Sequence, residues 1–211
     1  KPKRLAADNP LLYRAYLDGL TNALADPASG SYTEDFSLNL GHDYRAWLDE
    51  VQALSAQYRV IAYSRRYHFP NQGGGDGADY SLGLHARDLA GLMDALDLPN
   101  AHLVGHAYGA VLAASFAARY PERVRSLVLI EPTMPEIMAG SPQDSAFQVD
   151  RHLMVEQTRM ALQNGFPEMG IEHVCDWTFG ENWPLELSRS VKHWIVQNGP
   201  ALEFQYLAPP E

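Results

Sequence analysis

The fold is decided by the stretch AHLVGHAYGA, residues 101–110. Its first four residues form a short apolar run whose length and flanks favour a buried strand. Residues 108–120 are rich in alanine and suit a helix, which Pro121 ends. Between these two elements, Gly105 and Gly109 allow the strand and the helix to approach closely. The sequence therefore predicts a strand, a tight turn and a helix, in that order.

Ala107 stands at the centre of this turn, where the pattern Gly-x-Ser-x-Gly places a reactive serine. In that pattern the serine oxygen attacks a carbonyl carbon, a step that a methyl group cannot perform. Three explanations of Ala107 stay open: a laboratory Ser→Ala change, a natural protein that binds a ligand in the retained pocket, and an enzyme that works without this nucleophile. The sequence thus indicates a scaffold for acyl transfer and, as written, an inactive one.

Composition and charge limit the classes of function. The 211 residues, 46% of them hydrophobic, can bury one sizeable core, and the net charge of −10 disfavours nucleic acid and anionic membranes as partners. Cys175 is the single cysteine, so an intrachain disulfide and a cysteine-based metal site are excluded. We expect no metal and no cofactor. No apolar stretch reaches the length of a membrane span, and no signal-peptide core follows Lys1, so we expect a cytoplasmic protein unless an export signal has been cleaved.

Strand and helix patterns alternate from residue 44 to about residue 131, which predicts parallel βαβ units. The expected elements are a helix over 44–54 with Asp43 as its cap, a strand over 59–63, a helix that begins near Ser81 and ends before Pro99, and a strand over 124–130. The glycine-rich run 73–77 lacks the Lys-Ser/Thr ending of a phosphate-binding loop and is interpreted as a surface loop. Residues 31–40 are too polar for us to predict a strand there.

Beyond residue 132 the pattern is helical, over 135–170 and 176–205, and its clearest helix follows Pro184 and ends at 198–200. Helices at this point of the chain would cap the carboxyl edge of the sheet, where ligands bind in this architecture. Their large apolar residues could line a pocket or form the core of the cap itself. These residues are Met154, Met160, Phe166, Met169, Trp177, Phe179 and Trp183.

Three segments together, RVIAYSRR (59–66), HLVGHAYGA (102–110) and LVLIEP (127–132), resemble the middle of an α/β-hydrolase fold protein. The resemblance implies an α/β fold with a mostly parallel sheet and a helical cap inserted after the strand that follows the nucleophile elbow. It divides the chain into an N-terminal segment of uncertain role (1–40), a partial hydrolase core (41–134) and a cap that begins to return to the core (135–211). Residues 1–40 include an amphipathic helix from Asn9 that could serve as a docking element or a homodimer contact.

The resemblance also implies an activity and its residues. The expected parent activity is hydrolysis of a small, largely apolar carbonyl compound such as an ester or lactone, with Ala107 at the nucleophile position, Tyr108 donating its backbone N–H to the oxyanion, and Glu131 as the acid. The substrate-binding candidates are Arg65, His68, His106, Met154, Trp177 and Trp183. In the alternative lyase or cyclase, Arg65, Arg66 or His68 would polarise the substrate. No histidine occupies the position of the general base.

Two features depart from the family pattern. The His-Gly pair that normally precedes the first helix is reversed here as Gly41-His42, and the later strands that carry an acid and the general-base histidine are not found. Either a longer protein contains the missing segments or this chain is a reduced relative. The first explanation is favoured, because loss of strands would leave backbone groups and apolar surface unsatisfied.

Overall fold

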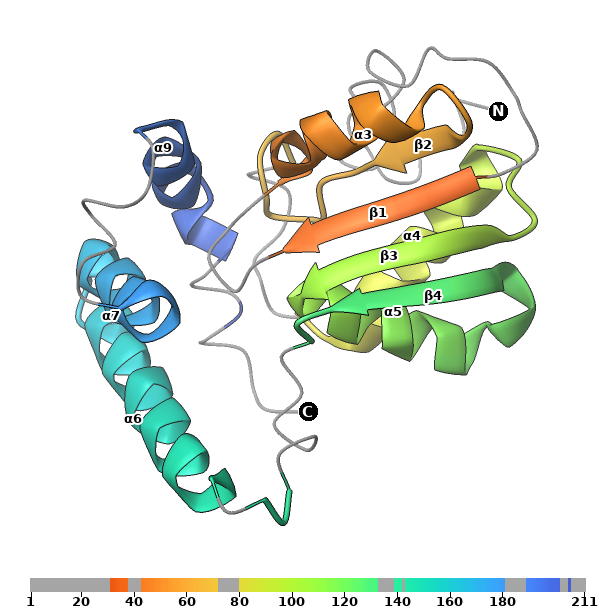
Figure 1. Ribbon diagram of the computed structural model, residues 1–211. Coiled ribbons are helices and arrows are strands. Elements are labelled where there is room, and N and C mark those ends of the chain that lie inside the picture. Colours follow the sequence, from red (N-terminus) through yellow and green to blue (C-terminus); the bar gives the residue numbers. More distant parts are fainter. Residues whose placement is uncertain are drawn as a thin grey trace.

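The computed structural model describes residues 31–37 (backbone), 43–71, 80–132, 139–141, 143–180, 189–201 and 205. Four parallel strands form its sheet: β1 (Ser31–Ser37), β2 (Arg59–Ala62), β3 (Ala101–Ala107) and β4 (Val124–Ile130). They lie side by side in the order β2-β1-β3-β4 (Figure 1). The predicted βαβ arrangement is therefore confirmed.

The strand β1 corrects the expectation that residues 31–40 form no strand. β1 lies inside the sheet, where Thr33 is in register with Ile61 of β2 and with Leu103 of β3. A strand between two partners is held by backbone hydrogen bonds on both edges, and these do not depend on side-chain polarity. Tyr32 and Phe36 favour a strand, whereas Glu34 and Asp35, two of the three residues between them, are depleted in strands and made the segment unlike one.

Helices cover both faces of the sheet. On one face lie α4 (Leu82–Ala95) and α5 (Tyr108–Arg119), and on the other the short 3-10 turn η1 (Tyr44–Trp47) continues into α3 (Leu48–Leu54). Alternation along the strands explains this division, since Leu103 packs with α4 and α5 while its neighbour Val104 packs with Trp47. Burial on both faces is what a parallel sheet requires.

The helix starts follow local capping. The Asp43 side chain accepts a hydrogen bond from the backbone N–H of Arg45 at the start of η1, as predicted, and Ser81 does the same for Leu84 at the start of α4. After α5, the 3-10 turn η2 (Pro121–Arg123) leads into β4.

Three further helices lie beyond the carboxyl ends of the strands: α6 (Asp144–Gln163), α7 (Pro167–Phe179) and α9 (Arg189–Gln197) (Figure 1). We call them the cap helices. They share an apolar cluster of their own, separate from the clusters of the sheet. This position confirms the predicted helical cap after the strand that follows the elbow.

The boundary predicted near Gly170 is wrong, because α7 runs through it. A Cβ at Gly170 would lie 3.1 Å from Cδ2 of Leu162 in α6. The glycine therefore permits close packing of α6 and α7 and does not end a helix.

The sheet ends at β4 among the described residues. Its side chains Val128, Leu129 and Ile130 are 46%, 37% and 40% exposed. None of the described helices is both long and apolar enough to cross a membrane. The expected helix from Asn9, the loop 73–77 and the start of the helix after Pro184 lie outside the described residues.

Candidate functional site

The predicted elbow is present at Ala107. β3 ends at this residue, α5 begins at Tyr108, and Ala107 has φ 52° and ψ −119°. Residues other than glycine rarely adopt a positive φ, and such strain is typical of functional sites. The Ala107 side chain lies in the turn where the Gly-x-Ser-x-Gly pattern places its nucleophile.

Gly105 explains how β3 can turn so sharply into α5. A Cβ at this position would lie 2.6 Å from the carbonyl carbon of Gly109 and 2.7 Å from Cα of Ala110. Both are backbone atoms and cannot move aside. Tyr108 is the first residue of α5, so its backbone N–H belongs to the first helical turn, whose N–H groups have no acceptor within the helix. This backbone N–H is the group that the family resemblance implies as the oxyanion donor.

A polar and aromatic cluster lies against the elbow, and we call Arg65, His68, Tyr80, His85 and Tyr108 the elbow cluster. The buried guanidinium of Arg65 donates to the Tyr80 hydroxyl (2.9 Å) and lies 3.2 Å from Nε2 of His68. It is 4.8 Å from the ring centroid of Tyr108. Nδ1 of His68 is 3.2 Å from the carbonyl oxygen of Arg66, so a proton on Nδ1 leaves Nε2 to accept from Arg65. Arg65 and His68 are thus brought together beside Tyr108.

His85 is the buried aromatic partner within this cluster. The centroid of its ring lies 4.6 Å from the ring centroid of Tyr80 and 6.2 Å from that of Tyr108, and the rings meet edge-on in both cases. Burial lowers the pKa of His85 well below its ordinary value of 6.5, and the nearby charges of Arg65, His68 and Arg66 lower it further. His85 is therefore neutral at neutral pH.

Arg66 is held apart from the elbow cluster by an ion pair. Its guanidinium donates to both carboxylate oxygens of Asp88, at 2.5 and 2.6 Å. These hydrogen bonds raise the pKa of Arg66. The bidentate geometry satisfies both groups and indicates a structural role for Arg66, in contrast to Arg65.

His106 and Glu131 form a pair at the carboxyl ends of β3 and β4. Nε2 of His106 lies 3.3 Å from Oε2 of Glu131, whose side chain is 82% exposed. Glu131 also has a positive φ of 46°. The structure therefore brings the predicted acid to the histidine that precedes the elbow residue, on the sheet face opposite α5.

The comparisons with known proteins agree with this geometry. A family model described as alpha/beta hydrolase fold matches residues 37–170. The chain belongs to this family. It is 34% identical over 119 residues to RutD of Pantoea ananatis and 39% identical over 95 residues to RutD of Variovorax paradoxus, both named as proposed carbamate hydrolases.

The chain spans less than half the length of these curated relatives. The two alignments cover 56% and 44% of this α/β-hydrolase chain and 42% and 35% of the relatives. Among solved structures, an epoxide hydrolase mutant from Bacillus megaterium has a TM-score of 0.64 at 15% identity, over 86% of this chain and 66% of that one. An enol-lactonase from Burkholderia xenovorans has a TM-score of 0.58 at 19% identity, over 85% and 64%. At these identities the structures support the fold alone.

Of the cap residues proposed to bind substrate in this α/β-hydrolase fold, Met154 and Trp177 are described by the structure, and both pack within the cap and not at the elbow. Met154 is buried in the core of the cap helices with Ile171 and Cys175, which is the second of the two alternatives left open for it and not the proposed substrate-binding place. Its neighbours fill the space between α6 and α7, so an apolar residue at this position stabilises the cap. Trp177 packs against the same cluster, 6.0 Å from the ring of Phe147. Trp183 lies outside the described residues.

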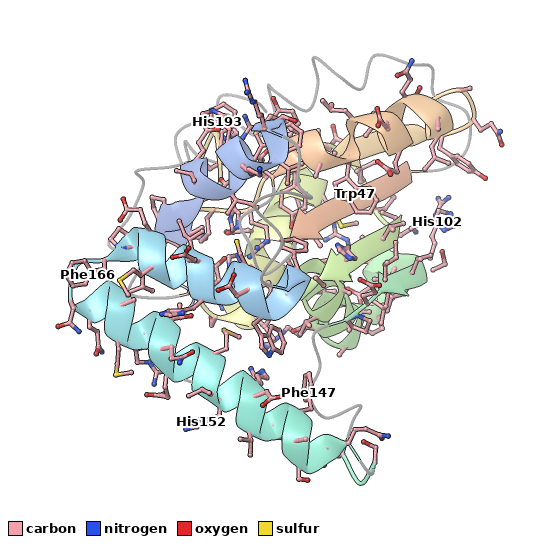
Figure 2. The ribbon with its side chains drawn as sticks, turned by 60° about the vertical axis from the view of Figure 1, so that its left-hand side comes forward. Trp47, His102, Phe147, His152, Phe166 and His193 are labelled. Atoms are coloured by element: carbon pink, nitrogen blue, oxygen red, sulfur yellow. The ribbon has the colours of Figure 1, made fainter. Side chains whose placement is uncertain are left out.

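Several large apolar residues and histidines of the cap helices are exposed, whereas Phe179 packs against the apolar cluster of the cap. Met160, Phe166 and Met169 are exposed, so these three do not form the core of the cap, which was one of the two alternatives left open for them. Figure 2 shows Phe166, His152 and His193 on the outside of the cap helices. These two histidines therefore lie away from the elbow.

Cys175 is not a nucleophile in this structure. Burial raises the pKa of its thiol to about 12, and the carboxylates of Asp176 and Glu172 add to the shift. The thiol form predominates at neutral pH and reacts poorly. Among the residues that the structure describes, no group of three or more His, Cys, Asp or Glu side chains could hold a metal ion.

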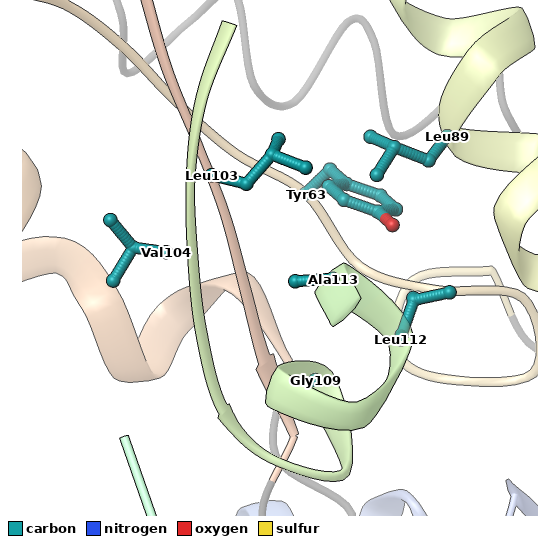
Figure 3. Close-up of a pocket in the computed structure, with 7 residues that line it drawn as sticks. All are labelled: Tyr63, Leu89, Leu103, Val104, Gly109, Leu112 and Ala113. Atoms are coloured by element: carbon teal, nitrogen blue, oxygen red, sulfur yellow. The ribbon is translucent and has the colours of Figure 1, made fainter. Parts of the chain in front are cut away.

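A cavity of about 10 Å³ lies beneath the elbow, between β3 and the helices α4 and α5 (Figure 3). Its lining is formed by Tyr63, Leu89, Leu103, Val104, Gly109, Leu112 and Ala113. This volume is close to that of a single water probe, so the cavity is a packing defect and not a substrate pocket.

Sequence reasoning missed Tyr80 and left His85 without a role. Tyr80 lies one residue before the cap of α4, and no local pattern marks its contact with Arg65. For His85 a signal was present, since it shares the apolar face of α4 with Leu89 and Leu92. A histidine on such a face is expected to be buried and neutral, as the structure has it.

Proposed function

We propose that this chain is built on a hydrolase scaffold for acyl transfer and that Ala107 removes the nucleophile from it. The observation that carries the proposal is the strained backbone of Ala107 directly before α5. An ordinary turn between a strand and a helix does not require a positive φ at a residue other than glycine. The elbow geometry therefore persists although the reactive oxygen is missing.

With serine at position 107, the covalent step would proceed as follows. The serine Oγ would bond to the carbonyl carbon of the substrate while a general base takes its proton, and the negative charge would gather on the carbonyl oxygen. The backbone N–H of Tyr108 would donate to that oxygen. Collapse of this intermediate would expel the leaving group, which takes the proton from the base, and would form an acyl-enzyme. Water would then attack the acyl carbon, which releases the acid and returns a proton to the serine Oγ. Glu131 is the acid we propose to orient a base.

The proposed substrates are small esters, lactones or carbamates. Relatives are named for carbamate hydrolysis and a structural neighbour for enol-lactone hydrolysis, and both reactions begin at a carbonyl carbon bonded to a heteroatom. An epoxide hydrolase is also a structural neighbour. Epoxide opening would favour an aspartate at position 107, whereas attack on a carbonyl would favour a serine. The flanking residues Gly105, His106, Tyr108 and Gly109 are the usual neighbours of such a serine and therefore favour the carbonyl substrates.

The test is to introduce the oxygen by Ala107→Ser in the complete protein. We expect this variant to react with a serine-directed fluorophosphonate and to hydrolyse p-nitrophenyl acetate, because the elbow already holds the backbone in the required geometry. Intact mass spectrometry measures the labelling. Ala118→Ser, on the exposed part of α5, is the matched control and should not be labelled. A folded Ala107→Ser protein that stays unlabelled would overturn the proposal.

A second candidate is a protein with no hydrolytic step. It is favoured by Ala107 itself and by the buried Arg65–His68 pair beside the elbow. A ligand-binding protein would hold the same ligand with similar affinity as wild type and as Ala107→Ser, and neither form would consume it. A lyase or cyclase would turn its substrate over with Ala107 present, and would lose that rate when both Arg65 and His68 are replaced.

A further inference from the structure

The helix α9 connects the cap to the core of the molecule. Its apolar side chains Val191 and Ile195 pack with Ile171 and Val174 of α7, so α9 belongs to the cap. Just past its end, Ala201 packs against Tyr67 and Tyr80 of the core and Tyr108 of the elbow. The turn between Ile195 and Ala201 is therefore where the cap meets the core.

Asn198 lies in this turn, and its side chain is completely buried. Its Oδ1 accepts a hydrogen bond from the backbone N–H of Phe69 at 2.6 Å. Its Nδ2 donates to Oδ2 of Asp43 at 2.9 Å and to the carbonyl oxygen of Trp194 at 3.0 Å. Only an amide side chain offers a donor and an acceptor in this arrangement. One residue thus joins the cap to two separate segments of the core.

Asp43 and Arg45 complete the network on the core side. The buried Asp43 carboxylate accepts hydrogen bonds from Nε and Nη2 of Arg45, at 2.7 and 2.5 Å. It also accepts the hydrogen bond from Nδ2 of Asn198. Nη2 of Arg45 also donates to Oε1 of Gln197 at 2.8 Å. The guanidinium lies over the Phe69 ring, 4.1 Å from its centroid, so the ring and the backbone of Phe69 are held at the same time.

The segment that Asn198 holds is the one that carries part of the elbow cluster. Phe69 directly follows His68, and Arg65 lies three residues before His68. Asn71 fixes the other end of this segment by donating from Nδ2 to the carbonyl oxygen of Ser64 at 2.6 Å. A displacement of Phe69 would therefore move His68 and, through it, Arg65 relative to Tyr108.

We propose that Asn198 is a positioning residue that latches the cap helices onto the core and holds residues 65–71 beside the elbow. Asp43, Arg45, Phe69 and Asn198 form this cap latch. Loss of the Asn198 amide leaves the part-buried Phe69 N–H without its acceptor and removes one of the two donors to Oδ2 of Asp43, which favours local opening of the latch. The structural claim is independent of the proposed function, and only its effect on turnover rests on that function.

Asn198→Ala tests the latch, with Asn164→Ala as the matched control. Asn164 stands at the end of α6 and donates from Nδ2 to the carbonyl oxygen of Met160 at 2.7 Å, the same local bond that Asn198 makes to Trp194. We expect amide hydrogen exchange of Phe69 and of α9 to accelerate about tenfold or more in Asn198→Ala. In Asn164→Ala these rates should be unchanged. Unchanged exchange at Phe69 in a folded Asn198→Ala protein would overturn the latch.

A measurement on the wild type keeps the proposal testable if Asn198→Ala does not fold. At low urea, the amides of Phe69 and of α9 should open in one step, with the same dependence on urea and well before the amides of β3. Independent opening of Phe69 and α9 would contradict the latch. In the Ala107→Ser background, Asn198→Ala should lower kcat about tenfold and Asn164→Ala should not. If Ala107→Ser has no activity, the exchange experiments still decide the latch while the proposed function fails.

Discussion

Ala107 keeps a backbone geometry that its side chain does not need. Its φ of 52° and ψ of −119° lie in a region of backbone conformation that is strained for L-residues. The methyl group of alanine makes no hydrogen bond or covalent bond that would require this conformation. Ala107 joins β3 directly to α5, and the two elements approach each other so closely at Gly105 that a Cβ there would meet the α5 backbone. The strain therefore belongs to the turn between β3 and α5 and not to the Ala107 side chain.

At this residue we expect Ala107→Gly to raise the free energy of unfolding by about 1 kcal/mol. Relief of a strain of about 1–3 kcal/mol outweighs the additional backbone entropy that glycine loses on folding, about 0.5–1 kcal/mol. Urea denaturation followed by circular dichroism measures the change. Ala110→Gly, inside α5, is the control and should lower the free energy of unfolding by about 1 kcal/mol or more. An equal loss in both variants would show that Ala107 is unstrained.

At the scale of elements, the contact between β3 and α5 depends on the missing Cβ of Gly105. The atoms that a Cβ would meet are the carbonyl carbon of Gly109 and Cα of Ala110, both part of the α5 backbone. Rigid backbone on both sides cannot relax as a flexible side chain would. Gly105 and Gly109 in the sequence thus indicate that β3 and α5 pack too closely for a side chain at position 105.

Gly105→Ala should accordingly destabilise the protein strongly, by about 3 kcal/mol or more, because α5 must shift away from β3. Gly91→Ala in α4 is the matched control, since a Cβ there would meet nothing within 4 Å. In that half-buried helical position, where a Cβ has open space, alanine should stabilise by about 0.5–1 kcal/mol. Thermal and urea unfolding of both variants compare the two effects. A mild loss in Gly105→Ala would refute the close β3–α5 contact.

At the scale of the whole molecule, His85 lies where the sheet layer and the cap meet. It is on the core side of α4, and its ring contacts Tyr80 and Tyr108, which also pack against Ala201 after α9. Because burial lowers the pKa of His85, the folded protein keeps this ring neutral at pH values where the unfolded chain protonates it. Global stability is thereby linked to pH.

The sign of this linkage follows from the lowered pKa. Below pH 6.5 the unfolded state binds the His85 proton and the folded state does not, so stability falls as the pH falls. A single group of this kind contributes a slope of up to about 1.4 kcal/mol per pH unit. We expect His85→Phe to reduce the loss of unfolding free energy between pH 7.5 and 5.5, measured by urea denaturation. His152→Gln, on the exposed face of α6, should leave that loss unchanged, and an unaltered slope in His85→Phe would contradict the assignment.

The sequence by itself determined the parts of this protein that depend on neighbours along the chain. Residues 101–110 predicted the strand, the turn and the helix of the elbow, and Asp43 predicted the start of the first helix, because periodicity and capping act over a few residues. The same local rules predicted that Ala107 leaves the elbow without a nucleophile.

The tertiary structure decided what depends on partners distant in the chain. The polar strand β1 is recognisable only between β2 and β3, Met154 belongs to the cap core only once α6 and α7 are packed, and Asn198 has a role only because folding brings it to Asp43 and Phe69. Backbone pairing and buried polar contacts between distant segments produce no periodic pattern of residues that could be recognised in the sequence. For that reason the elbow could be predicted from the sequence, whereas the elbow cluster and the cap latch could not.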